Sequence, residues 1–240
     1  MEKHSYKDFH LKGLLLESGY FRFDVQITFF GNFASASNIS TPFKRYSAGI
    51  SSIASGIFDG IGMHSYAFMM YDLALISLLG VTKTLNPFDI RKPCCYDYNH
   101  LGKFLNQPDI KKAMHVLNGW TQECNFTTFQ RMEKDIYTDF SPQLISLLDE
   151  YNLKVYIYNG NVDMMTNTEG LLHYLNTLQW SQKIQWKLTH FKPFYADGLE
   201  KGVYKSYKNL FYMYAYNSGH RVSYDEPDVT FELLSRILYG

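Results

Sequence analysis

Two apolar runs that end in polar tips organise the chain. Leu153–Tyr158 is rich in β-branched and aromatic residues and leads into Asn159–Asp163. This pattern predicts a covered strand followed by a turn. Beyond the turn a helix is predicted from Met164 on, because leucines recur at helical spacing, at Leu171, Leu172, Leu175 and Leu178. Asp163 therefore lies just past the carboxyl end of a strand, where open α/β sheets place their chemistry.

The second run is Leu210–Tyr216, and Asn217–His220 is its tip. Pro227 then begins a predicted helix, because proline suits the first helical position. Its apolar face consists of Leu233, Leu234, Ile237 and Leu238. An acid at one strand tip and a histidine at a later one form the last two members of a Ser…Asp…His order. In such a pair the carboxylate holds the imidazole tautomer and stabilises its protonated form, while the imidazole moves the proton.

Further strands are predicted on either side of these two runs. His10–Glu17 contains three consecutive leucines, which is typical of an interior parallel strand. Lys183–Tyr207 contains alternating stretches such as Gln185–Phe191, which predict edge strands or a hairpin. Residues 21–100 show no clear alternation of strands and helices apart from a helical patch at Ala67–Leu79.

Two helices are predicted in the middle of the chain. One begins at Pro108 and has Ile110, Ala113, Met114 and Leu117 on one face. The other has Ser141 as its N-cap and Pro142 at its first position, and it leads into the strand that precedes Asp163. The whole pattern is that of an α/β protein.

These motifs resemble the C-terminal half of a serine carboxypeptidase, a family with the α/β-hydrolase fold. The matching segments follow the family in order and spacing along nearly the whole chain: Leu11–Leu16, Asp89–Cys94, Cys95–Asp97, Lys103–Pro108, Tyr158–Asp163 and Gly219–Pro227. The resemblance implies one partial α/β-hydrolase domain over residues 1–240, built from the C-terminal strands and helices of a mostly parallel sheet. It implies a helical cap insertion at about residues 21–100. It also implies that Asp163 and His220 are the acid and base of the catalytic triad.

The serine nucleophile has no counterpart in the sequence. No G-x-S-x-G motif occurs, and the family places its serine upstream of the strand that matches Leu11–Leu16. Glu17-Ser18-Gly19 echoes the serine elbow, but Leu16 stands where the elbow needs a small residue. We therefore expect the chain to lack the nucleophile and to be inactive alone. Completed by an N-terminal half, it would release C-terminal residues from peptides through an acyl-enzyme.

A second hypothesis is a noncatalytic remnant that acts as a binding or regulatory partner. It is motivated by the missing serine and by Arg221 and Ser223, which replace the methionine and proline that usually follow the family histidine. An Arg221 guanidinium pointing inward would disfavour the imidazolium, whereas one pointing to solvent would change little. Acyl transfer and hydroxynitrile cleavage, which are related chemistries of the family, also stay open.

Composition narrows the choice of partners. The chain has 23 basic and 23 acidic residues and a formal net charge of zero, so nothing favours nucleic acid or an acidic membrane surface. The longest apolar region, Tyr66–Val81, is too short to span a bilayer. No histidine or cysteine spacing of the zinc type occurs, and we expect no metal or other cofactor. The expected partner is a peptide substrate, and a homodimer stays open.

Sequence features that bear on the compartment are mixed. Asn38-Ile-Ser40 and Asn125-Phe-Thr127 are N-glycosylation sequons, whereas the first residues given, Met1–Asp8, contain no apolar run of the kind expected in a signal peptide. The resemblance implies a vacuolar, lysosomal or secreted protein. Of the three cysteines, Cys94 and Cys95 are adjacent, where a disulfide would be strained, and the family partner of Cys124 lies upstream. Three ordinary thiols are an equally good interpretation.

The resemblance has one further physical consequence. The strand around Leu14 would normally pair with the strand that carries the nucleophile. Without that neighbour an apolar strand edge and sheet face would lie open, which favours aggregation. We expect the isolated chain to be poorly soluble unless an N-terminal partner completes the sheet.

Overall fold

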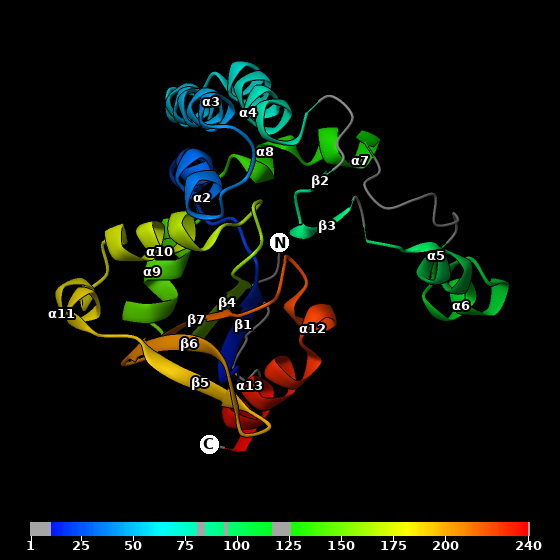
Figure 1. Cartoon of the computed structure of the whole chain (residues 1–240). Helices are drawn as coiled ribbons and strands as arrows, with labels where there is room; N and C mark the ends of the chain where they lie inside the picture. The colour runs from blue at the N-terminus through cyan, green and yellow to red at the C-terminus, as the bar shows by residue number, and fades with distance from the viewer. Residues whose placement is uncertain (1–10, 81–84, 94–95, 117–125, 240) are drawn as a thin grey trace, which may run out of the picture.

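A five-stranded sheet forms the centre of the computed structural model, which describes residues 11–80, 85–93, 96–116 and 126–239. Its strand order is β1-β4-β7-β6-β5 (Figure 1). The strands are β1 Gly13–Glu17, β4 Lys154–Gly160, β7 Leu210–Ala215, β6 Leu199–Tyr207 and β5 Lys192–Ala196. The first three are parallel to one another, and β6 and β5 join as an antiparallel hairpin. The α/β class and the strands predicted around Leu14, Ile157 and Tyr212 are confirmed.

The period-two pattern of the strands divides the core between the two faces of the sheet. On one face, Ile157 and Tyr212 pack with the helices α9 Ser141–Asp149, α10 Thr168–Thr177 and α11 Lys183–Leu188. On the other, Tyr158 and Met213 pack with α12 Val222–Asp225 and α13 Pro227–Tyr239. Figure 1 shows the two groups of helices on opposite sides of the strands. β4 and β7 are therefore covered on both faces, and Asp163 and His220 follow their carboxyl ends.

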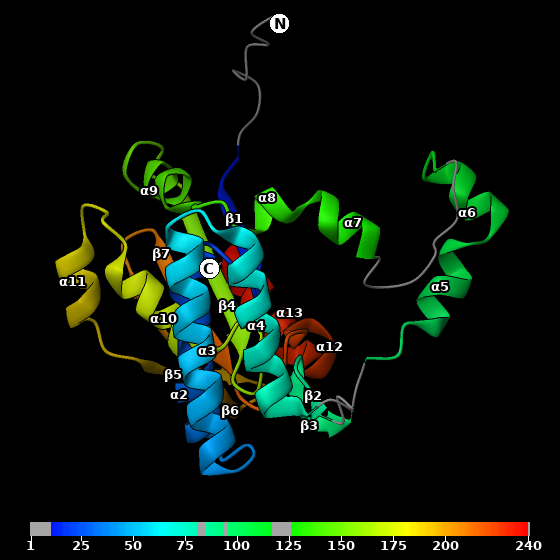
Figure 2. The ribbon, with the colours of Figure 1, turned by 90° about the horizontal axis from the view of Figure 1, so that it is seen from above.

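Helices make up most of residues 21–80, part of the region 21–100 in which the sequence showed no clear alternation of strands and helices. A short α1, Phe23–Gln26, continues through a 3₁₀ turn, Ile27–Phe29, into α2, Phe30–Ala36. Two long helices follow, α3 Pro42–Gly60 and α4 His64–Leu79, which lie side by side across the molecule in Figure 2. The sequence predicted α4 from Ala67 to Leu79, all but its first turn. It missed α3 because the helix mixes serine, glycine and isoleucine and buries the small residues instead of the large ones.

A two-stranded ribbon and a group of short helices connect α4 to the second half of the chain. The ribbon, called the strap below, consists of β2 Leu85–Asn86 and β3 Asp89–Pro93. It is followed by α5 Asn99–Leu105, α6 Pro108–Ala113, α7 Phe126–Arg131 and α8 Glu133–Ile136. Figure 2 shows α5 and α6 standing away from the sheet. Among the described residues, no helix has the length and apolar character that crossing a bilayer requires.

Two local predictions need correction. The helix at Pro108 forms, but its predicted apolar face is not buried: Ala113 and Met114 are exposed, and the helix contains no buried residue. Leu117 lies outside the described residues. The predicted edge strand at Gln185–Phe191 is instead mostly the helix α11. Its alternating apolar residues misled the prediction, because Trp186 alone is buried while Ile184 and Leu188 face solvent.

Candidate active site

Asp163 is held at the end of β4 by a tight junction between two strand tips. The Val162 amide donates to the Ser218 carbonyl at 3.0 Å, so the turn after β4 is fixed to the turn after β7. Gly160 permits this approach, because a Cβ there would collide with the backbone of Ser218 and Gly219. The Asp163 side chain is completely buried. The glycine of the Asn-Gly-Asn run is therefore a packing requirement of the site.

His220 is positioned by the strap and by α12. Its amide donates to the Phe88 carbonyl at 2.7 Å, and the imidazole lies against the Phe88 ring with 5.2 Å between ring centroids. The Gly219 amide donates to Oδ2 of Asp225 at 2.8 Å. A Cβ at Gly219 would collide with the Phe88 carbonyl. Residues from two separate segments, the strap and α12, thus fix the backbone at the histidine.

The two predicted site residues meet directly. Nδ1 of His220 lies 2.9 Å from Oδ2 of Asp163. The carboxylate is buried, whereas the histidine side chain is 26% exposed. With the Nδ1 proton donated to the carboxylate, Nε2 is the nitrogen that is free to accept a proton. The pair therefore has the geometry of a general base and the acid that orients it.

Thr166 contacts both Asp163 and His220, and sequence reasoning missed it. Its hydroxyl donates to Oδ2 of Asp163, and its amide donates to Oδ1 at 3.2 Å. The same hydroxyl oxygen lies 3.4 Å from Nδ1 of His220. Both carboxylate oxygens are thus engaged. The signal available in the sequence was the spacing Asp-x-x-Thr just before a helix, where side chains commonly bind nearby backbone amides.

A buried charge network supports the histidine loop. Asp89 is buried and paired with Arg91 and Lys92, and Lys92 also pairs with the buried Asp225 at 2.6 Å. Burial tends to raise the pKa of Asp89, but the hydrogen bonds from Arg91 and Lys92 outweigh it and lower the pKa. The Tyr96 hydroxyl donates to Asp225 at 2.9 Å. Since Asp225 also accepts from Gly219, the network links the strap to the histidine loop.

Two tyrosines contact Met165, which lies between Asp163 and Thr166 in the chain. The Tyr20 hydroxyl donates to the Met165 carbonyl, and the Tyr71 hydroxyl lies 3.4 Å from the Met165 sulfur. Burial, with smaller contributions from Tyr71 and Asp163, raises the pKa of Tyr20. Burial likewise raises the pKa of Tyr71. Both hydroxyls stay protonated at neutral pH and act as neutral hydrogen-bonding groups.

The two residues that depart from the family pattern make contacts of their own. The Arg221 guanidinium lies 5.6 Å from the centre of the Tyr98 ring, an arrangement typical of a cation–π contact. The Ser223 amide donates to Oε1 of Glu17 at 2.9 Å, and its hydroxyl donates to Oε2 at 3.3 Å. A proline could not make the first of these bonds. Ser223 therefore fastens α12 to the end of β1.

Ser18, the serine that echoes the elbow, lies directly after β1. Its φ of 48° is in the left-handed region, its amide donates to the Tyr158 carbonyl at 2.9 Å, and the residue is buried. Among the described residues its hydroxyl has no hydrogen-bond partner. The three cysteines lie outside the described residues. Within those residues, no group of three or more histidine, cysteine, aspartate or glutamate side chains could hold a metal ion.

Comparison with known proteins decides the family. The serine carboxypeptidase family model matches residues 4–240. The chain belongs to the serine carboxypeptidase family. Serine carboxypeptidase 3 of Oryza sativa subsp. japonica is 31% identical over 178 residues, which cover 72% of this chain and 35% of the rice protein. A serine carboxypeptidase-like protein of the same species is 32% identical over 178 residues, covering 72% of this chain and 41% of that protein.

A solved carboxypeptidase has the same fold. The crystal structure of Kex1Δp, a prohormone-processing carboxypeptidase from Saccharomyces cerevisiae, superposes with a TM-score of 0.78 at 17% sequence identity. The match covers 98% of this chain and 56% of the yeast chain. The matched part of this carboxypeptidase homologue thus covers less than half of each rice relative and a little over half of the yeast chain.

Proposed function

We propose that this chain is the C-terminal portion of a serine-type carboxypeptidase and supplies the acid and base of its triad. The observation that carries the proposal is the 2.9 Å contact between His220 Nδ1 and the buried Asp163 carboxylate. Its place at the tips of two adjacent parallel strands, within a chain of this family, supports the assignment. Completed by a segment that bears a serine, the protein would release C-terminal residues from peptides.

The geometry suggests a role for each residue. His220 would accept the proton of the serine hydroxyl through Nε2 and then deliver it to the leaving amine. Asp163 would orient the imidazole and stabilise its charged form, and Thr166 would hold the carboxylate in place. An acyl-enzyme would form on the serine and be hydrolysed by water. Without the serine and its oxyanion hole, Asp163 and His220 would give essentially no peptidase activity.

We propose that the serine-bearing segment adds to the sheet at the open edge of β1. Within the described residues β1 pairs with β4 on one side only. Beside it lies a groove of about 530 Å³, lined by Lys12 and Lys154 and by apolar residues in or next to the edge strand and on α13: Leu11, Leu14, Leu15, Leu234, Ile237 and Leu238. An unpaired edge beside an apolar groove favours the addition of another strand. That strand would be the one that bears the nucleophile. Residues 21–100 would then form the cap over the site.

Sequencing the transcript upstream of the Met1 codon, followed by reconstitution, tests the proposal. The chain is produced together with the upstream-encoded segment, and release of the C-terminal residue from a blocked dipeptide is measured. We expect His220→Ala to lower turnover by about 10⁶-fold and Asp163→Asn by about 10⁴-fold, as in other serine proteases. The exposed residues His190 and Asp197 provide matched controls, His190→Ala and Asp197→Asn, which leave turnover unchanged.

The competing function is a noncatalytic carboxypeptidase-like partner. It is favoured by the absence of a G-x-S-x-G motif from the sequence. A stop codon upstream, together with a soluble chain that melts cooperatively by itself, would support this function. Insoluble material that is rescued only by a serine-bearing segment would contradict it. The two functions are thus separated before any substrate is chosen.

The proposed compartment is vacuolar, lysosomal or extracellular. Asn38 of the first sequon is exposed in the short connection between α2 and α3, where a glycan could be accommodated. Asn125 lies outside the described residues. A mobility shift on treatment with an endoglycosidase, lost in Asn38→Gln when Asn125 is also replaced, would support this compartment. An unmodified protein from the native source would contradict it.

A further inference from the structure

One turn of the strap contacts the loops of both predicted site residues. The turn consists of residues 86–89, between β2 and β3. The amide of Met164, the residue after the acid, donates to the Pro87 carbonyl at 3.1 Å. The amide of His220 donates to the Phe88 carbonyl at 2.7 Å. Two consecutive carbonyls of the strap therefore hold the loop of the acid and the loop of the base.

Further backbone bonds connect the three segments to one another. The Ile90 amide of the strap donates to the Val162 carbonyl at 3.2 Å, just before the acid. The Val162 amide in turn donates to the Ser218 carbonyl at 3.0 Å, two residues before the base. Strap, acid loop and base loop are thus each bonded to the other two. The separation of Asp163 and His220 therefore depends on the position of the strap turn.

The turn is tightly packed against the base. A Cβ on Gly219 would lie 2.2 Å from the Phe88 carbonyl oxygen and 2.8 Å from the Asp89 Cβ. The Phe88 ring also lies against the imidazole of His220, with 5.2 Å between ring centroids. The Asp89 side chain is completely buried and paired with Arg91. A displacement of this turn would therefore displace the imidazole as well.

Asn86 gives the turn its shape. The residue is 1% exposed, and its Oδ1 accepts a hydrogen bond from the Phe88 amide at 3.0 Å. An asparagine side chain that binds the backbone two residues further on closes an Asx turn. The following Pro87 restricts Asn86 to extended backbone conformations and fixes its own φ. The bond from Phe88 to the asparagine side chain then orients the next two carbonyls.

We propose that Asn86 is a positioning residue for the pair of Asp163 and His220, acting through the strap turn whose backbone holds both loops. This inference rests on the proposed function. In a triad the carboxylate fixes the tautomer and the orientation of the imidazole. A misplacement of about 1 Å can cost about 100-fold in rate. Loss of the Asn86 bond should therefore lower turnover while leaving peptide binding unchanged.

Kinetics of the reconstituted protein, the chain together with its upstream-encoded segment, test the inference. We expect Asn86→Ala to lower kcat by about 100-fold and to keep KM within about twofold. Asn86→Ser should lose only about tenfold, because a hydroxyl can accept the same bond more weakly. An unchanged kcat in Asn86→Ala, with turnover abolished in His220→Ala, would overturn this inference and leave the proposed function standing. An unchanged kcat in His220→Ala would overturn both.

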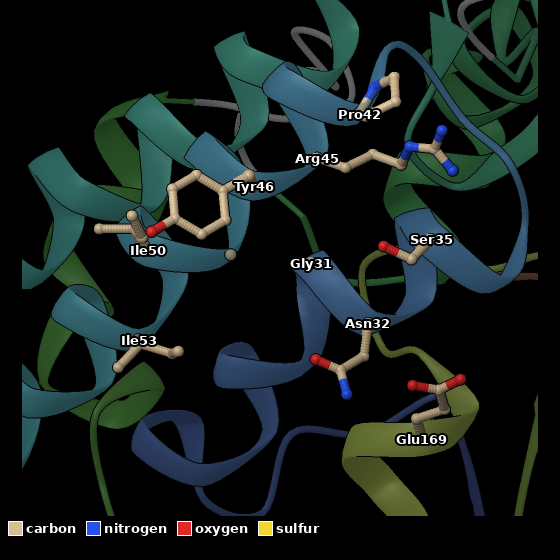
Figure 3. A pocket seen from close by; sticks show the side chains of 10 residues that line it. Gly31, Asn32, Ser35, Pro42, Arg45, Tyr46, Ile50, Ile53 and Glu169 are labelled. Carbon is tan, nitrogen blue, oxygen red and sulfur yellow. The ribbon is translucent and has the colours of Figure 1, made fainter.

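Two other asparagines serve as matched controls. Asn209 binds the Leu148 and Leu153 carbonyls at 2.8 and 3.1 Å, at the amino ends of β4 and β7. Asn209→Ala should lower the melting temperature but keep kcat within about twofold. Asn32 lines a groove of about 730 Å³ between α2, α3 and α10 (Figure 3), whose lining includes no residue of the strap or of the two loops. Asn32→Ala should change neither quantity. Equal losses of kcat in Asn86→Ala and Asn209→Ala would overturn the inference.

A spectroscopic signal separates positioning from stability. The proton on Nδ1 of His220 is hydrogen-bonded to the buried carboxylate, so it should give a downfield NMR signal in protein with isotope-labelled histidine. The signal is assigned by its loss in His220→Gln. We expect it to shift or broaden in Asn86→Ala and in Asn86→Ser, and to stay in place in Asn209→Ala. Should Asn86→Ala fail to fold, Asn86→Ser alone decides. An unshifted signal in a folded Asn86 variant would overturn the inference.

Discussion

The paired strands β4 and β7 and the hairpin α3–α4 solve opposite packing problems. In the strands, large side chains such as Ile157 and Tyr212 are fully buried, and glycine appears only where backbones touch. In the hairpin, serine, glycine and alanine are buried and isoleucine faces solvent. The difference shows that burial in this chain does not follow hydrophobicity alone. The strands complete their core within the chain, whereas the hairpin and the edge of β1 leave apolar surface for others to cover.

The largest loss of stability is expected on substitution of Gly160, where the backbones of two strand tips are in contact. Gly160→Ala places a methyl group against the carbonyl of Ser218 and should lower the free energy of unfolding by about 4 kcal/mol or more. Gly62→Ala is the contrast: the residue has a positive φ of 79° but nothing near it, so the cost should be about 1 kcal/mol. Urea denaturation of both variants measures the difference.

A pair of isoleucines tests the comparison directly. Ile157→Ala removes a completely buried side chain and should cost about 3 kcal/mol. Ile57→Ala removes one that is 60% exposed and should change the free energy of unfolding of the monomer by less than about 0.5 kcal/mol. Urea denaturation at concentrations where the protein is monomeric is the measurement. A loss above 2 kcal/mol for Ile57→Ala would mean that the hairpin is not a surface of the monomer.

The strap that holds His220 should make stability depend on pH. The pKa of Asp89 is lowered in the folded chain, so its ion pairs stabilise the fold above the unfolded pKa of about 3.9 and lose this effect as pH falls through the folded pKa. Arg91 and Lys92 are partly exposed, and water screens the pairs. Asp89→Asn should cost about 1–2 kcal/mol at pH 7. The difference from the wild type should shrink below pH 4 in acid titrations of stability.

The smallest expected change in the free energy of unfolding is a gain, at Lys205. Lys205 is buried on β6 with its ammonium 4.3 Å from the centre of the Trp186 ring, and burial lowers its pKa. Its charged form is penalised in the fold, so the wild type should gain stability as pH rises toward 10. The contact with Trp186 offsets part of this penalty. Lys205→Met should therefore stabilise the fold by about 1 kcal/mol at pH 7, measured by thermal unfolding. A loss would show that the cation–π contact outweighs burial.

The sequence was most informative where local pattern and burial agree. The strands before Asp163 and His220 are apolar runs followed by turn residues, so their tips and the two site residues could be placed from sequence alone. Thr166 could not, because its role depends on a turn that brings it back to the carboxylate. The strap was equally hidden, since the hydrogen bond from His220 to Phe88 joins segments far apart in the chain. The helix α3 was missed because its pattern is inverted.

Three assignments stay predictions: the catalytic roles of Asp163 and His220, the cap function of residues 21–100 and the peptide substrate. The 2.9 Å contact between His220 and Asp163 supports the first of them. Family membership and fold are established by the match over residues 4–240 and the likeness to the yeast carboxypeptidase. Fold and activity differ in this respect because a fold can be recognised from part of its core, whereas activity needs every reacting group.

The parallel pairing of β1 with β4 also determines how late the central sheet can form during synthesis on the ribosome. Gly13 pairs with Lys154, about 140 residues later, and Glu17 binds Ser223, 206 residues away. At synthesis rates of roughly 5–20 residues per second, β1 would wait on the order of 10–30 s for its neighbour. During that time the edge of β1 that pairs with β4 stays open, even if an upstream strand already covers its other edge. The pairing of β1 with β4 is therefore a late step of synthesis, and this edge is an aggregation risk until it forms.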